Sequence, residues 1–264
     1  MNTSSLTSKP ETANKAELYS RRFFSDNVAG SLSSARVLLG AVFDIYRPVS
    51  IVDVGCGAGA WLKAAEELGA LELTGLDGEW VNPSNLASAR IAFYPTNLEG
   101  PFKLGRKYDL CLSMEVAEHL APSAATQFID NLCAASDVVL FSAAIEHQGG
   151  VMHLNEQPQS YWAARFSSNG FEHHDLFRPL FWHDKRVDPW YRQNALLYVN
   201  SSNPLAALLR DRTHPSIPLD LVHPEIFCGN LETYKRPTEE PTLRYCWQTF
   251  KRWQKRQLRA LLTR

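Results

Sequence analysis

The chain has little net charge, few cysteines and no long apolar segment. Its 27 Lys and Arg residues nearly balance 28 Asp and Glu residues, and the formal net charge of -1 gives no overall field that favours nucleic acid. The five cysteines include no C-x-x-C pair, and their number is odd. Since the N-terminus also lacks the pattern of a signal peptide, we expect a cytoplasmic protein in a reducing environment. No apolar run approaches the length of a membrane span.

What remains is a chain of 264 residues with 45% hydrophobic content, enough for one sizeable core and a small appendage. Strand and helix patterns alternate, which predicts a parallel sheet covered by helices on both faces. The predicted strands are 50–54, 72–76, 91–94, 108–113, 137–143, 171–182 and 195–200. The predicted helices are 31–46, 59–69, 123–134 and 157–169. The predicted domains are a disordered tail (1–14), a main domain (15–200) and an extension (201–264) that ends in a basic amphipathic helix.

The most informative segment is 51–60, with the sequence IVDVGCGAGA, a β-branched strand followed by closely spaced glycines. Residues 61–68 then continue with helical spacing. Gly55, Gly57 and Gly59 make a strand-to-helix turn in which main-chain atoms can approach a ligand at the positive end of a helix. The segment therefore predicts a nucleotide-like cofactor at the carboxyl end of a parallel sheet.

Two kinds of nucleotide fit the glycines themselves. Gly55, Gly57 and Ala60, with Asp77 about twenty residues further on, satisfy the loose dinucleotide fingerprint of a dehydrogenase. Asp53 argues against it, because a carboxylate two residues before the first glycine would repel a pyrophosphate. The same carboxylate could meet the ammonium group of a methionine moiety.

Several segments, taken in order, resemble the successive motifs of class I S-adenosylmethionine-dependent methyltransferases. They are 53–59 (DVGCGAG), 76–77 (LD), 96–99 (TNLE) and 108–120 (YDLCLSMEVAEHL). The resemblance spans residues 20–200 and is greatest to bacterial methyltransferase-domain proteins of glycan and secondary metabolism. It implies an α/β fold, a Rossmann-like seven-stranded sheet with helices on both faces and an antiparallel last strand.

The resemblance also implies roles in binding S-adenosyl-L-methionine. Asp77 ends the second strand, where an acid accepts hydrogen bonds from the ribose hydroxyls; an ordinary turn acid is the alternative. Asn97 stands where the family usually has Asp, and it keeps a carbonyl that can accept from the adenine amino group. Leu98 would flank the adenine. The predicted cofactor-binding residues are therefore Asp53, Gly55, Gly57, Gly59, Asp77, Asn97 and Leu98.

Glu115, Glu118 and His119 follow the fourth predicted strand and are the candidate catalytic residues. Carboxylates and imidazoles suit Mg²⁺, Mn²⁺ or Zn²⁺, and His147 or His153 could supply a further ligand. The pattern is similar to small-RNA 2′-O-methyltransferases and to ubiquinone-pathway O-methyltransferases. This similarity implies a divalent metal held by Glu115, Glu118, His119 and His153. A metal-free site in which His119 acts as general base or binds substrate, and a purely structural role, remain alternatives.

The main functional hypothesis is an O-methyltransferase that acts on a hydroxyl of a sugar, glycan or sugar-like small molecule, because a metal that chelates two adjacent hydroxyls activates one of them. The alternatives are a 2′-O-methyltransferase of RNA ends and a non-catalytic cofactor-binding partner of a biosynthetic enzyme. The segment 181–191, expected in a loop between the last two strands, carries aromatic and polar residues that suit carbohydrate, or that cement the hairpin. The basic C-terminal helix would pack on the domain, on a second copy in a homodimer, or on a membrane surface.

Overall fold

The computed structural model describes residues 21–212 and 219–234. The chain divides into two compact units, 1–227 and 228–264, and the fold and the site belong to the first. The predicted tail (1–14) and the predicted basic helix near the C-terminus lie outside the described residues. No helix among the described residues is long and apolar enough to cross a membrane.

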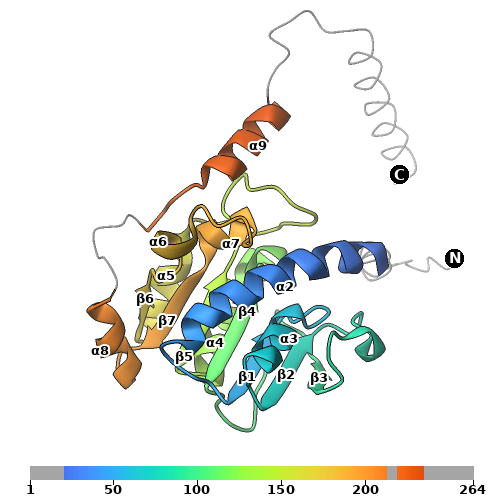
Figure 1. Ribbon diagram of the computed structural model, residues 1–264, viewed down its shortest axis with the longest axis vertical. Coiled ribbons are helices and arrows are strands. Elements are labelled where there is room, and N and C mark those ends of the chain that lie inside the picture. The colour runs from blue at the N-terminus through green and yellow to red at the C-terminus, as the bar shows by residue number, and fades with distance from the viewer. Residues whose placement is uncertain (1–20, 213–218, 235–264) are drawn as a thin grey trace, which may run out of the picture. The chain divides into compact units, whose positions relative to one another are not determined.

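A seven-stranded sheet in the order β3-β2-β1-β4-β5-β7-β6 forms the centre of this unit (Figure 1). Its strands are β1 (Ser50–Val54), β2 (Glu72–Asp77), β3 (Ile91–Pro95), β4 (Leu110–Met114), β5 (Val138–Ser142), β6 (Phe171–His174) and β7 (Leu196–Asn200). The pairs from β3 to β5 are parallel, whereas β7 runs antiparallel to both β5 and β6. The predicted α/β sheet with an antiparallel last strand is therefore confirmed.

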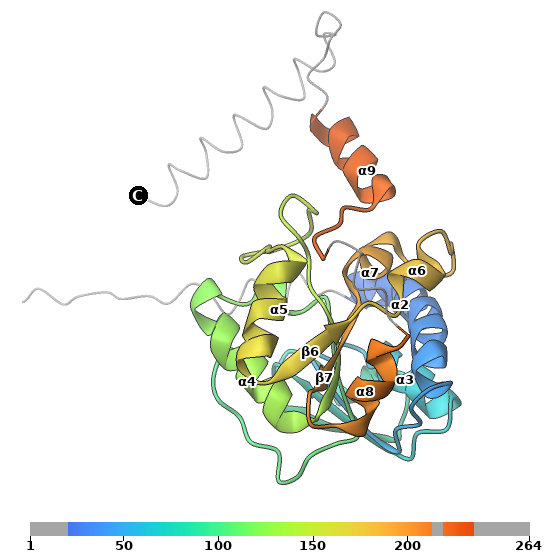
Figure 2. The same cartoon turned by 90° about the vertical axis from the view of Figure 1, so that its left-hand side faces the viewer.

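Helices cover both faces of the sheet (Figure 2). In chain order the helices among the described residues are α2 (Arg21–Phe43), α3 (Ala60–Glu67), α4 (Ala125–Ala135), α5 (Gln159–Ser168), α6 (Arg178–Phe181), α7 (Pro189–Asn194), α8 (Pro204–Arg210) and α9 (Pro224–Tyr234), the last of which extends into the second unit. Short 3-10 turns are η1 (Pro83–Asn85), η2 (Ala117–His119) and η3 (Pro122–Ala124). Helices α4 and α5 lie on one face, and α2, α3 and α8 lie on the other.

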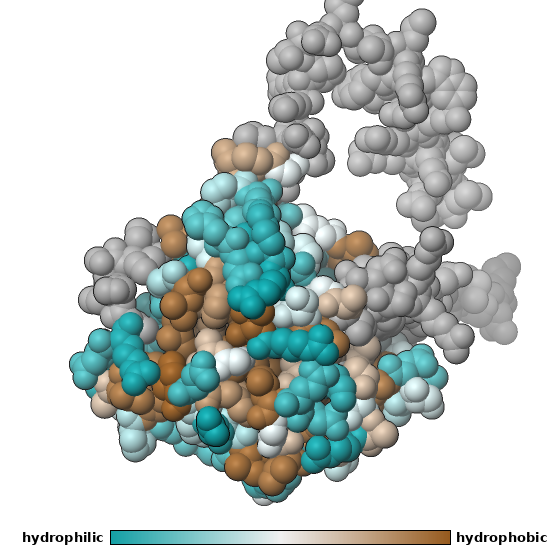
Figure 3. Space-filling view, viewed as in Figure 1, coloured by the Kyte–Doolittle hydropathy of each residue, from teal (hydrophilic) through white to brown (hydrophobic). Residues whose placement is uncertain are grey.

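Each face of the sheet has its own hydrophobic core, because successive side chains of a strand point to opposite faces. Ile51 of β1 packs in one cluster with Leu38 of α2, and its neighbour Val52 packs in the other with Phe128 of α4. Strands buried on both faces read as continuous apolar runs, which is why β1, β4 and β5 stood out in the sequence. On the outside, polar and apolar residues are interspersed over the face seen in Figure 3.

One predicted strand was wrong. The segment 171–182 is a strand only from Phe171 to His174, and Arg178–Phe181 forms helix α6. Pro179 lies in the first turn of that helix, where its missing N–H costs nothing, whereas a proline inside a strand removes a ladder hydrogen bond. A buried ion pair between Arg178 Nε and Asp175 Oδ2, 2.9 Å apart, stabilises the turn between β6 and α6.

Candidate active site

The candidate site lies along the edge of the sheet where the parallel strands end. The predicted residues lie near the carboxyl ends of β1 to β5 or in the segments that follow them, and Asp53 and Asp77 belong to β1 and β2 themselves. Strands β1 and β4 are adjacent although the chain visits β2 and β3 between them. Ligands of open α/β sheets bind at such a switch point, so the topology places the glycine turn beside the carboxylates after β4.

The glycine turn has the backbone that its sequence predicts. Gly55, Gly57 and Gly59 have φ angles of 90°, 51° and 79°, in the left-handed region that favours glycine. A Cβ at Gly55 would lie 2.4 Å from a methyl carbon of Val116, so the space is also needed. Gly59 is the N-cap of α3 and provides no side-chain hydrogen bond to it. The first N–H groups of α3 therefore face the turn as donors for a ligand.

Asp77 ties this turn to the second strand. Its Oδ2 accepts a hydrogen bond from the Gly57 N–H at 2.8 Å, and its Oδ1 accepts one from the Gly78 N–H at 2.6 Å. Burial raises the pKa of Asp77, and these N–H donors oppose the rise. The structure thus brings together Asp77 and the glycine turn, as the sequence analysis expected.

Asp53 lies in β1, two residues before the same turn. Its side chain is buried, its Oδ2 has no hydrogen-bond partner, and burial together with the charge of Asp77 raises its pKa well above the usual range. Asn97 and Leu98 follow β3: Asn97 is exposed and its Oδ1 accepts from the Glu99 N–H at 3.1 Å, whereas Leu98 is buried. Asn97 keeps a second lone pair on this oxygen.

A second group of residues lies after β4. Glu118, His119 and His153 each offer a ligand atom, and these atoms all lie within 4.8 Å of one another. The two imidazole rings meet edge to face with centroids 4.8 Å apart. Glu118 has 0% of its surface exposed, and neither of its carboxylate oxygens accepts a hydrogen bond of normal geometry. A buried acid without such partners is costly, and this group of one carboxylate and two imidazoles is of a kind that could hold a metal ion.

His153 is oriented by a carboxylate of its own loop. Its Nδ1 lies 2.7 Å from Glu156 Oε1, and Glu156 also accepts hydrogen bonds from the backbone N–H groups of His147 and Gly149 at 2.8 and 3.1 Å. A carboxylate on one ring nitrogen commonly fixes the other as a metal ligand. His153, and not His147, is therefore the histidine of this loop that joins the group.

Glu115 is not one of those three residues, but its carboxyl shares a hydrogen bond with that of Glu118. It has a φ of 55°, and its carboxylate accepts hydrogen bonds from Gln148 Nε2 at 2.8 Å and from Asn194 Nδ2 at 3.2 Å. Burial raises the pKa of both Glu115 and Glu118, and that of Glu118 is raised further by the charge of Glu115. Since the amide donors stabilise the charge on Glu115, a proton shared by the two carboxyls belongs mainly to Glu118.

Sequence reasoning missed the amides that hold Glu115. Gln193 is fully buried, and its Nε2 donates to Gln148 Oε1 at 3.1 Å and to Asn194 Oδ1 at 2.9 Å. Its Oε1 accepts from the His223 N–H at 2.7 Å. A continuous set of hydrogen bonds thus joins Glu115 to the segment just before α9. Neutral amides belong to no motif that the sequence could have shown.

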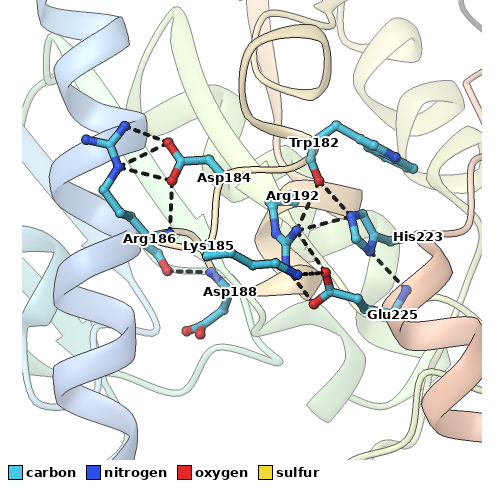
Figure 4. Close-up of polar contacts among 9 residues, drawn as sticks. Trp182, Asp184, Lys185, Arg186, Asp188, Arg192, His223 and Glu225 are labelled. Carbon is cyan, nitrogen blue, oxygen red and sulfur yellow. Dashed lines mark hydrogen bonds and ion pairs between the residues drawn. The ribbon is translucent and has the colours of Figure 1, made fainter.

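Figure 4 shows how that segment is anchored. The imidazole of His223 donates from Nε2 to the Trp182 carbonyl at 2.8 Å, and its Nδ1 accepts from the Glu225 N–H at 3.2 Å. Arg192 donates to the same Trp182 carbonyl at 3.0 Å and to Glu225 Oε2 at 3.0 Å, and Lys185 also pairs with Glu225. Burial lowers the pKa of His223, which favours the neutral ring that these two bonds require.

The aromatic and polar residues of 181–191 are mostly engaged in packing. Trp182 packs on the ring of His223 with centroids 4.5 Å apart, and Asp184 pairs with Arg186 at 2.6 Å. Tyr191 is buried against Trp61. Helix α6 ends at Phe181 and α7 begins at Pro189, so residues 182–188 lie in a loop, as expected, and only the ends of the segment are helical. These contacts favour the interpretation that the segment stabilises the fold by packing.

A family model described as "Methyltransferase domain" matches residues 20–184, which is more than half of the chain. A ubiquinone biosynthesis O-methyltransferase of Methylobacterium sp. (strain 4-46) is 33% identical over 96 residues, covering 33% of this chain and 36% of that protein. A second ubiquinone biosynthesis O-methyltransferase, from Methylobacterium nodulans, is 31% identical over 96 residues. The chain thus spans about a third of the length of these curated relatives.

Among solved structures, the DhpI–SAH complex has a TM-score of 0.50 at 16% identity and covers 73% of this chain and 97% of that chain. Magnesium protoporphyrin IX methyltransferase (ChlM) from Synechocystis PCC 6803 with bound SAH has a TM-score of 0.48 at 17% identity, covering 74% and 90%. At such identities the likeness concerns the fold alone.

Proposed function

This chain belongs to the class I S-adenosylmethionine-dependent methyltransferases, and from that premise we propose that it methylates a hydroxyl oxygen of a sugar, a glycan or a sugar-like small molecule. The single observation that supports oxygen as the methyl-accepting atom is the buried group of Glu118, His119 and His153, which could hold a metal ion. The partial similarity to two O-methyltransferases supports it.

For the cofactor, we propose the positions that the motifs suggest. The turn of Gly55, Gly57 and Gly59 and the start of α3 would receive the methionine part, with Asp53 near its ammonium group. Asp77 would accept from the ribose hydroxyls, because its carboxylate lies directly beside the turn. Asn97 and Leu98, after the neighbouring strand β3, would contact the adenine.

The residues after β4 fit a divalent metal. The carboxyl of Glu118 is fully buried, ligand atoms of His119 and His153 lie within 4.8 Å of it, and Glu156 orients His153. Oxygen and imidazole donors suit Mg²⁺, Mn²⁺ or Zn²⁺. When bound, such a metal would lower the pKa of a hydroxyl and hold a neighbouring oxygen of the same substrate.

Glu115 is the proposed acceptor of the hydroxyl proton. Its carboxylate is held by Gln148 and Asn194, which fix its position and favour its charged form. A general base must lie within hydrogen-bond reach of the proton that it takes, and Glu115 directly follows β4 at the same edge as the glycine turn. Glu115 is also the fourth metal ligand that the family resemblance implies.

Cofactor binding is tested by calorimetry with S-adenosylhomocysteine, with NADH as the ligand expected to give no heat. Asp77→Ala should weaken S-adenosylhomocysteine binding by about 1–3 kcal/mol, the typical effect of losing hydrogen bonds to a charged group. Glu79→Ala is the matched control, because Glu79 is an exposed acid of the same loop. Equal affinities for all three proteins would show that the ribose binds elsewhere.

The acceptor is tested with radiolabelled S-adenosylmethionine and a panel of glycosides, catechols, mono-hydroxylated analogues, amines and thiols, with Mn²⁺ or with excess chelator. We expect label in compounds with adjacent hydroxyls, and less label when the metal is removed. Label that appears only in amines or thiols would contradict the proposal, and full activity in chelator would contradict its metal.

A further inference from the structure

The loop after β2 folds the side chain of Trp80 back onto the end of that strand. A hydrogen bond of 3.2 Å from the Val81 N–H to the Gly78 carbonyl closes the turn. A Cβ at Gly78 would lie 2.1 to 2.4 Å from three ring carbons of Trp80, so the indole rests on the main chain of residue 78. Gly78 does not have a positive φ, so its glycine is required for space and not for backbone conformation.

The indole also reaches the carboxylate that is proposed to bind the ribose. Trp80 makes a side-chain hydrogen bond to Asp77, in addition to the backbone bonds from Gly57 and Gly78. A carboxylate has about four acceptor positions, and these three donors leave about one. A ribose diol brings two donors, so it cannot bind Asp77 fully while the indole remains.

Of the three donors, the indole is the one that can leave. The Gly57 and Gly78 N–H groups belong to the main chain of the turn, whereas Trp80 is a side chain with 44% of its surface exposed. Asp77 itself is only 8% exposed. Rotation of Trp80 towards solvent would uncover Gly78 and free one acceptor position without a change in the backbone.

We infer that Trp80 sets the affinity of the cofactor site: its indole occupies the place at Asp77 that the ribose hydroxyls take, and the cofactor displaces it. This inference rests on the proposed role of Asp77. Binding of the adenosine then replaces the hydrogen bond from the indole to Asp77 with one from the ribose. The ribose therefore gains less from Asp77 than it would without Trp80, and this lowers the affinity for the methyl donor and for the demethylated product alike.

Trp80→Phe tests the inference, because phenylalanine keeps a ring over Gly78 and lacks the N–H donor. By calorimetry, S-adenosylhomocysteine should bind this variant roughly ten- to hundredfold more tightly than the wild type, as expected when one competing hydrogen bond to a charged group is removed. Gly78→Ala should act in the same direction, because the new methyl group expels the indole. Trp190→Phe, on α7, is the control and should leave the affinity unchanged.

A second measurement follows the indole itself. S-Adenosylhomocysteine should shift the tryptophan emission of the wild type and of Trp190→Phe to longer wavelength, and should not shift that of Trp80→Phe. Unchanged or weaker binding by Trp80→Phe would overturn the inference, as would an emission shift that persists without Trp80. If Asp77→Ala binds as tightly as the wild type, the proposed ribose site fails and this inference fails with it. If Asp77→Ala binds weakly and Trp80→Phe does not bind more tightly, only the role of Trp80 is refuted.

Discussion

Replacing Glu118 with glutamine should stabilise the protein in chelator and remove its stabilisation by a divalent metal. Burial and the charge of Glu115 raise the pKa of Glu118 well above the usual value. When the pKa of an acid is higher in the folded state than in the unfolded state, the folded state holds more protons at any pH between the two values. The free energy of unfolding therefore falls as the pH rises above the unfolded-state pKa. Glutamine does not titrate, and its amide can donate to Glu115, so at neutral pH this penalty disappears.

The metal-dependent part has a definite size. A ligand at 100 times its dissociation constant stabilises the folded state by about 2.7 kcal/mol. For a domain of this length, 1 kcal/mol corresponds to roughly 2–4 °C in Tm, so saturating Mn²⁺ should raise the Tm of the wild type by about 5–11 °C. Glutamine keeps one neutral oxygen but loses the charge that balances the cation, and we expect the shift to fall below about 2 °C.

The assay is thermal unfolding at pH 7.5, first in excess chelator and then over a Mn²⁺ titration. Glu67→Gln is the control, since Glu67 pairs with Arg36 on the surface and is not part of the group. If Mn²⁺ stabilises Glu118→Gln as strongly as the wild type, the metal binds elsewhere. A lower Tm of Glu118→Gln in chelator would show that the carboxylate has a stabilising partner.

Two further predictions concern the segment before α9. Gln193→Leu should remove three hydrogen bonds and leave the buried His223 N–H without an acceptor, which should lower the free energy of unfolding by about 1–3 kcal/mol and speed hydrogen exchange in the loop 147–156. Asn131→Leu, at another buried amide, should leave exchange in that loop unchanged, and equal exchange in both variants would refute the link. Burial lowers the pKa of His223 from 6.5, so its stabilising contribution is present above pH 6.5 and is lost as the pH falls through the folded-state pKa. The Tm of the wild type should therefore fall more steeply from pH 7.5 to pH 5.5 than that of His223→Asn, and parallel profiles would contradict this role.

Local patterns predicted most of the sheet. The apolar strands and the turn at Gly55 are encoded within a few residues, and their backbone conformation follows from sterics alone. The segment 171–182 was misinterpreted because its aromatic residues favour a strand, although Pro179 argues for an interruption. The proline was the local signal that could have corrected the prediction.

The candidate site was predictable where it is local and unpredictable where it depends on packing. Glu118 and His119 are adjacent in the sequence, and His153 was chosen from a resemblance; the structure brings all three together. Asn194, by contrast, reaches Glu115 across 79 positions in the chain. Such a contact depends on how α7 and the loop after β5 pack, and no spacing rule describes it.

The three buried acids at this edge of the sheet differ in their hydrogen-bond partners, and for this reason we propose a different ligand group for each. Asp77 accepts hydrogen bonds from main-chain and indole N–H groups, and these bonds stabilise its charged form. Such a carboxylate suits a ligand whose donors are neutral, as the hydroxyls of a ribose are. Burial raises the pKa of both Asp53 and Glu118 well above the usual values, and the backbone groups of Glu118 and Ala144 oppose that rise at Glu118 only in part. A buried carboxyl of this kind ionises more readily when a cation lies beside it. Because Asp53 lies in β1 just before the glycine turn and Glu118 lies beside two imidazoles, the proposed cations are the ammonium group of the methyl donor for Asp53 and a divalent metal for Glu118.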